Sequence, residues 1–215
     1  MTTLAERKRR CAVCGHEQEY TEITSTNSFG PMDLDSRPPE MQRSTMDYWI
    51  QLCEKCGYSC GHIEDSIPGI GLDDLKSEEY QALLNNNTIN KLSRAFLLAG
   101  HLYSKAKEFR VAGFRYLRAA WAFDDRNESD NAKHARNKAI ENMNIFLEGT
   151  ADTTLSTVSV DLYRRNGRFE EAEERARRLI DSGANDVPVK VLEFQILLCK
   201  NKDKGCYTVG DVKYT

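Results

Sequence analysis

The chain has 215 residues and carries 30 Lys and Arg against 33 Asp and Glu, a net charge of −3 at pH 7. This balance argues against a protein that grips phosphate backbones through clustered positive charge. No stretch approaches the roughly 20 apolar residues of a membrane-spanning helix, and no signal peptide is evident near the start. We therefore expect a cytoplasmic protein, without a membrane partner, whose seven cysteines are reduced.

The composition changes near residues 69–71, from a loop-rich, cysteine-rich part to a helical remainder. Residues 1–70 carry 7 basic and 11 acidic side chains, whereas residues 71–215 carry 23 and 22. We predict two domains with these bounds, a zinc-ribbon-like domain over 1–70 and a helical domain over 71–215. The run Arg7–Arg10 is the one basic cluster of the first domain, and we expect it to be a solvated tail.

The motif CxxCG occurs twice in the first domain. A CxxC turn directs two sulfurs at one metal ion, and the glycine allows a left-handed turn that brings backbone amides toward the sulfurs. Four thiolates suit zinc and leave no coordination position for a substrate or an activated water. The alternatives are redox pairs or two disulfides, and sites of four cysteines also accept iron. The sequence predicts one structural Zn²⁺, bound by Cys11, Cys14, Cys53 and Cys56.

Between the two knuckles the sequence predicts a ribbon with an enlarged hairpin loop. Residues 19–26 and 44–52 read as its strand-like arms. Cys60 and His62 follow the second knuckle, and we expect a small buried thiol and a surface imidazole there, not further ligands.

The loop over 27–43 has two interpretations. Loops of this length are often functional, so its arginines could engage an anionic group and its aspartates a cation or an opposing base. Alternatively, the aspartates cap turns and the arginines pair with them inside the module. We favour the second, because no nucleophile stands beside a base. As candidate partner-binding residues the loop offers Asp33, Asp35, Arg37 and Arg43.

The second domain is helical in pattern. We predict a short helix from Leu72 to about Leu84, a long helix over Asp130–Leu147 and a final helix over Val187–Lys200. Two helix pairs match tetratricopeptide spacing, one from Phe96 to Ala119 and one from Val160 to Leu179. The fold class is therefore α+β and mostly α, a small N-terminal zinc ribbon followed by a short TPR-like α-solenoid.

Side chains of the first helix pair are candidates for a partner-binding groove. Arg115 and Arg118 could clamp acidic or aromatic side chains of another protein or peptide. The alternative is that they are solvated, as arginines on helix faces usually are, and that Tyr103, Tyr116 and Trp121 are core residues.

The layout resembles the bacterial domain-of-unknown-function 2225 family. The similarity covers most of the chain, and Glu54 departs from it by standing where such knuckles often have proline. The resemblance implies zinc binding through the four cysteines. It is carried by the two knuckles together with Ser25-Thr-Asn-Ser-Phe-Gly30, Asp33-Leu-Asp35, Arg37-Pro-Pro-Glu-Met-Gln-Arg43, Tyr48-Trp49, Cys56-Gly-Tyr58 and Ala119-Ala-Trp121.

These observations favour a non-enzymatic, zinc-binding adaptor for protein–protein interaction. The first alternative is a nucleic-acid or ribonucleoprotein factor, which would need Arg7–Arg10, Arg37, Arg43 and Lys55 on one basic face. The second is an enzyme that uses the loop over 27–43, which would need those acids and arginines buried together in a cleft.

Overall fold

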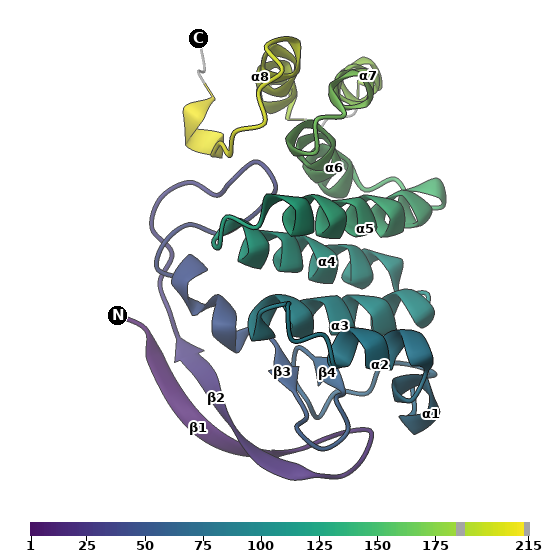
Figure 1. Cartoon of the computed structure of the whole chain (residues 1–215). Coiled ribbons are helices and arrows are strands. Elements are labelled where there is room, and N and C mark those ends of the chain that lie inside the picture. The colour runs from purple at the N-terminus through teal and green to yellow at the C-terminus, as the bar shows by residue number, and fades with distance from the viewer. Residues whose placement is uncertain (184–187, 213–215) are drawn as a thin grey trace. The chain divides into compact units, whose positions relative to one another are not determined.

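The structure, a computed structural model, describes residues 1–183 and 188–212. Its elements group into two compact units, each made of two segments of the chain (Figure 1). The first unit comprises Met1–Asn27 and Ser44–Asn142, and the second comprises Ser28–Arg43 and Met143–Thr215. The boundary predicted at residue 70 falls inside the first unit, and the loop over 27–43 falls almost entirely in the second.

Helices make up most of the described chain, and the strands are confined to two small sheets, which confirms the predicted α+β, mostly α class. The strands are β1 (Thr3–Arg10), β2 (Glu17–Ser25), β3 (Gln51–Leu52) and β4 (Ser59–Cys60). The α-helices are α1 (Leu72–Leu75), α2 (Glu78–Leu84), α3 (Lys91–Lys105), α4 (Phe109–Asp124), α5 (Ser129–Glu148), α6 (Thr153–Arg165), α7 (Phe169–Asp181) and α8 (Val189–Lys200). Short 3-10 helices lie at η1 (Arg43–Tyr48) and η2 (Val209–Asp211).

The run Arg7–Arg10, expected to be a solvated tail, instead lies in β1, which pairs antiparallel with β2. The tail prediction was wrong because the basic run faces acidic side chains across the ribbon. Lys8 and Arg10 both pair with Glu17, at 3.0 and 2.9 Å, and Arg9 pairs with Glu22 at 2.7 Å. Opposite charges placed across two strands stabilise the pairing.

The two predicted ribbon arms do not pair with each other. The first arm, 19–26, lies largely within β2 as expected, but its partner is β1. Most of the second arm, 44–52, is the 3-10 helix η1, and only Gln51–Leu52 is a strand, which pairs with β4. Thr45 and Met46 are buried side by side, which an alternating strand would not allow.

The helices predicted over residues 93–181 are present. Helices α3 and α4 form a hairpin through residues 106–108, and they pack closely at Gly100, where an added Cβ would lie 2.9 Å from the Tyr116 ring. Their counterparts in the second unit are α6 and α7, with the left-handed Gly183 closing α7 at a φ of +63°. Helix α5 is the long intervening helix and contributes residues to both units.

Two helix bounds differ from prediction. The helix expected over 72–84 is divided into α1 and α2 at Lys76 and Ser77, because Ser77 adopts extended backbone at the α2 N-cap. The last helix begins at Val189; Val187, where it was predicted to begin, lies outside the described residues.

In the second unit the segment 28–43 is held by the C-terminal segment. Leu34 donates its backbone N–H to the carbonyl of Tyr207 at 2.9 Å, and Val209 donates to Met32 at 2.8 Å. Leu34 also packs in the apolar core of this unit with residues of α8. Among the helices of the described residues, none has the length and apolar character needed to cross a membrane.

Candidate metal centre

The four knuckle cysteines lie together in the first unit. One sulfur from each is within 4.8 Å of the other three. The Sγ atoms of Cys11 and Cys56 are 3.7 Å apart, and those of Cys14 and Cys53 are 3.6 Å apart. All four are free thiols, since these distances far exceed a disulfide bond of about 2.05 Å.

Both knuckles use the same backbone turn. In the first, Gly15 donates its N–H to the carbonyl of Cys11 at 2.9 Å, and Cys11 donates to the carbonyl of His16 at 2.8 Å. In the second, Gly57 and Cys53 make the equivalent bonds, at 2.9 and 2.8 Å. Gly15 and Gly57 have φ of +68° and +76°, the left-handed region that glycine tolerates without strain. The repeated turn orients each pair of sulfurs toward the other pair.

The sulfur positions fit a tetrahedral metal ion. With a metal–sulfur distance of about 2.3 Å, as for zinc, the edges of a sulfur tetrahedron are about 3.8 Å long. The two short sulfur–sulfur distances, 3.6 and 3.7 Å, are close to this value. Four sulfurs then fill every position of a tetrahedral ion, which leaves no place for a reacting group.

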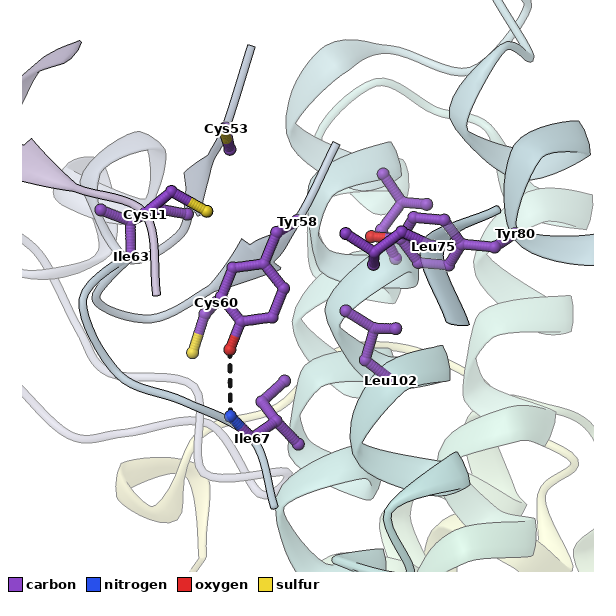
Figure 2. Close-up of a cluster of buried hydrophobic side chains, with 10 residues drawn as sticks. Cys11, Cys53, Tyr58, Cys60, Ile63, Ile67, Leu75, Tyr80 and Leu102 are labelled. Carbon is purple, nitrogen blue, oxygen red and sulfur yellow. Dashed lines mark hydrogen bonds between the residues drawn. The ribbon is translucent and has the colours of Figure 1, made fainter. Parts of the chain in front are cut away.

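The cluster is built into the core of the first unit. Figure 2 shows Cys11 and Cys53 beside Tyr58, Cys60 and Ile63, with Leu75, Tyr80 and Leu102 on the helical side. Tyr80 donates its hydroxyl to the carbonyl of Gly57 at 2.7 Å, which ties α2 to the second knuckle. Apolar residues of α1, α2 and α3 therefore cover the metal site and depend on it.

The thiols are unequal in exposure. Cys11 and Cys53 are buried at 2% and 1% exposure, whereas Cys14 and Cys56 are half-buried and border a cavity with Lys55, Leu72 and Lys76. Burial raises the pKa of the Cys11 and Cys56 thiols above the usual value. A bound cation reverses this effect, because it favours the thiolate that coordinates it.

Cys60 and His62 do not join the cluster. Cys60 is 1% exposed and its sulfur lies 3.2 Å from the hydroxyl of Tyr103, while His62 is at the surface. Both positions match the expected small buried thiol and surface imidazole.

The candidate residues of the loop over 27–43 all lie in the second unit, and both of its candidate aspartates are ion-paired there. Asp33 accepts from Arg43 at 2.5 Å, and Asp35 accepts from Arg165 of α6 at 2.8 Å. Asp33, Asp35 and Arg37 are buried at 2%, 1% and 7% exposure. The interpretation in which the loop arginines pair with the loop aspartates therefore holds for Arg43 and Asp33. The partner of Asp35 is Arg165 of α6, so both aspartates are neutralised within the second unit.

Sequence reasoning missed the partners that α6 supplies. Arg164 is fully buried and donates to Asp161 at 2.5 Å and to the backbone carbonyls of Asp203 and Gly205 at 2.8 and 2.9 Å. Burial raises the pKa of the Asp161 carboxyl, and Arg164 opposes that rise. The spacing of Asp161 and Arg164, three residues apart on a helix, is the sequence signal that could have indicated the pair.

The other candidates, Arg115 and Arg118, lie on α4 in the first unit, far along the chain from the loop candidates. Arg115 lies over the Tyr103 ring and Arg118 over the Trp49 ring, with 5.7 and 5.5 Å from guanidinium carbon to ring centre. The predicted candidates therefore form two separate groups, one in each unit.

A family profile matches residues 4–195, which is most of the chain. The protein belongs to the DUF2225 family, described as an uncharacterized protein conserved in bacteria. Neither a curated protein nor a solved structure matches the chain. The chain is thus a member of a bacterial family, and its own four cysteines are placed to bind a metal ion.

Proposed function

We propose that the protein is a cytoplasmic, non-enzymatic adaptor whose zinc ion stabilises the first unit and whose TPR-like helix pairs bind another protein. The observation that carries the proposal is the closed cysteine cluster. Its four sulfurs are placed to fill the positions of a tetrahedral ion, and two of the cysteines, Cys11 and Cys53, are buried in the core. A metal ion in this site stabilises the fold and has no position for a substrate. Zinc is the ion that four thiolates at this spacing suit best.

The charges support a protein partner over nucleic acid. In the first unit, Lys8, Arg9 and Arg10 are each paired with a glutamate of β2. In the second, Arg43 pairs with Asp33. Basic groups already neutralised by neighbouring carboxylates contribute little to phosphate binding, because they displace few of the counterions condensed on a nucleic acid.

The loop acids also lack the features of catalytic groups. They are buried together with arginines, as the enzymatic alternative requires. However, Asp33 is ion-paired with Arg43, and Asp35 is ion-paired with Arg165. A general base needs a lone pair free to take a proton from a bound substrate. These carboxylates instead connect the loop to the rest of the second unit.

The test is to identify a partner and rebuild the complex. The protein, tagged at its native level, is purified with and without nuclease treatment, and each stoichiometric partner is then mixed with the chain as purified components. Direct, nuclease-resistant binding to one protein supports the adaptor. A complex that nuclease dissolves, with purified chain that binds RNA or DNA, favours the ribonucleoprotein alternative and contradicts the proposal.

A further inference from the structure

Two arginines of α4 share one face and are enclosed by aromatic rings. Arg115 and Arg118 are three residues apart, so their side chains project from the same side of the helix. Tyr103 of α3 lies under Arg115, and Trp49 lies under Arg118. The backbone at Gly61 closes one side, since an added Cβ there would be 2.7 Å from Nη2 of Arg115.

This arginine pair has no internal counter-charge among the described residues. Arg118 makes no hydrogen bond or ion pair there, and no carboxylate of that part of the chain forms an ion pair with Arg115. The Nε atoms of both are buried without a hydrogen-bond partner. By contrast Arg136, also in the first unit, is paired with Asp124.

Two neighbouring cations without an anion are unfavourable in a half-buried place. Burial, and then the charge of Arg115, lowers the pKa of Arg118 to about 10, so it is still protonated at neutral pH. A cation removed from water without a partner destabilises the folded state, and an incoming anion relieves that cost. All five residues of the site keep some exposure, so an anion can reach the pair from solvent.

We propose that Arg115 and Arg118, with Trp49 and Tyr103, form the binding site for a glutamate or aspartate side chain of the protein partner. Guanidinium groups bind carboxylates through two parallel hydrogen bonds, and the rings contact the apolar stem of the incoming side chain. Arginine, tryptophan and tyrosine are the residue types that dominate binding energy at protein interfaces.

The charge around the site favours a carboxylate on a protein over a nucleic-acid phosphate. The first unit, which contains the site, carries 17 basic and 18 acidic side chains. A nearly neutral unit gives a polyanion little long-range attraction but accommodates one acidic side chain on a mixed surface. The inference rests on the proposed adaptor function and specifies the chemistry of its partner.

A measurement of thermal stability tests whether the Arg115–Arg118 pair lacks a counter-charge, and it needs no binding partner. Arg118→Met keeps an apolar stem over Trp49 and removes the charge, so we expect its Tm to rise by a few degrees in low-salt buffer. Arg136→Met is the matched control, because it breaks the ion pair with Asp124 and should lower the Tm. A fall in Tm for Arg118→Met would show that the charge is satisfied internally and would overturn the proposal.

A binding measurement tests the ligand chemistry. The chain has two tryptophans, so only two indole N–H signals appear in an NMR spectrum, and Trp49→Phe assigns that of Trp49. We expect a capped glutamate peptide to shift this signal saturably at millimolar concentration, and its glutamine counterpart to leave it unchanged. The shift should vanish in Arg118→Met and persist in Arg126→Gln, a surface control whose arginine pairs with Glu128. Equal shifts with the glutamine peptide, or tighter binding of inorganic phosphate or an oligonucleotide, would contradict the proposal.

The partner found for the adaptor gives the decisive comparison. Arg118→Met should weaken its binding by about tenfold or more, and Arg126→Gln should leave it unchanged. If both variants bind a verified partner like the wild type, the arginine site is wrong and the adaptor function stands. If no partner exists while the glutamate peptide still binds at Trp49, the adaptor function fails and the carboxylate site remains.

Discussion

The metal site of the first unit and the surroundings of segment 28–43 in the second unit bury polar groups in different ways. The first unit surrounds its metal site with thiols and tyrosine hydroxyls that carry no charge of their own in the absence of metal. The second unit buries full charges, the pairs Asp161–Arg164 and Asp35–Arg165. At the metal site a bound cation would balance the thiolates, whereas in the second unit each of these charges is balanced by another side chain.

This difference between a metal site and buried ion pairs follows from which segments of the chain each unit holds together. Two short knuckles 38 residues apart have few side chains of their own, and a metal ion held by the four cysteines would link them through four bonds. The second unit has to hold the loop over 28–43 and the C-terminal segment against α6. Arg164 does this through bonds to two backbone carbonyls, which fix one geometry. Buried ion pairs supply such specificity more reliably than they supply stability.

Metal removal is expected to have the largest effect, and it should separate the units. A structural zinc site contributes on the order of 10 kcal/mol to folding, about as much as a whole domain's stability. We expect chelation, or Cys53→Ser, to unfold the first unit while amides of α6 and α7 stay protected in hydrogen-exchange mass spectrometry. Elemental analysis of the purified protein identifies the ion as zinc or iron.

The control is Cys199→Ser, which changes a buried thiol outside the cluster and should keep one metal ion per chain. Unaltered protection of both units in the metal-free protein would show that the metal does not hold the fold of the first unit.

Breaking the buried ion pair of the second unit is expected to have the next largest effect. Arg164→Met leaves the Asp161 carboxylate buried alone and frees two backbone carbonyls, so it should cost about 3–5 kcal/mol in urea unfolding. Adding Asp161→Leu removes the stranded charge and should recover part of the loss. Arg178→Met, which breaks an exposed pair with Glu174, should change stability by less than about 1 kcal/mol. A loss no larger than in this control would mean that Arg164 only fills space.

The features that could be predicted from the sequence are those set by residues a few positions apart. A CxxCG motif determines its own turn, so the four cysteines and both left-handed glycines could be predicted from spacing alone. The helices of residues 93–181 were equally accessible, because apolar periodicity and turn residues act within a few positions.

Pairing between distant segments was not accessible in this way. That Arg7–Arg10 would form a strand depended on glutamates in β2, and the fate of Asp35 depended on Arg165, 130 residues later. The spacing of the two candidate groups, the loop and α4, gave no sign that they belong to different units. Such contacts are set by tertiary packing, which a local pattern does not encode.

A smaller effect is expected from Gly100→Ala, which tests how closely α3 and α4 approach. The new Cβ would lie 2.9 Å from the Tyr116 ring, and overpacking of this kind costs about 1–3 kcal/mol, less about 1 kcal/mol gained in helix propensity. Gly149→Ala is the control, because nothing lies within 4 Å of its added Cβ. Equal unfolding midpoints for the two variants would show that the ring moves aside at no cost.

The smallest effect is expected from Glu22, whose carboxylate is ion-paired across the β1–β2 ribbon. Arg9 donates to both its oxygens, at 2.8 and 2.7 Å, and lowers the pKa of the Glu22 carboxyl to about 2. Its stabilisation is therefore complete above the unfolded value of about 4.3 and is lost as the pH falls through 2. We expect Glu22→Gln to cost about 1 kcal/mol at pH 7, and this difference from the wild type to shrink below about pH 4.5.

The experiment compares urea unfolding of the wild type, Glu22→Gln and Glu19→Gln at each pH, with metal content checked in every sample. Glu19→Gln removes the same charge from the same strand and leaves the contacts of Glu22 in place, so the difference between the variants reports the contacts of Glu22 with Arg9 and Gln51. If Glu22→Gln and Glu19→Gln have the same free energy of unfolding at every pH, the ion pair with Arg9 contributes nothing to stability. In that case β1 is held by its backbone pairing with β2, and the charges across this ribbon add nothing to its stability.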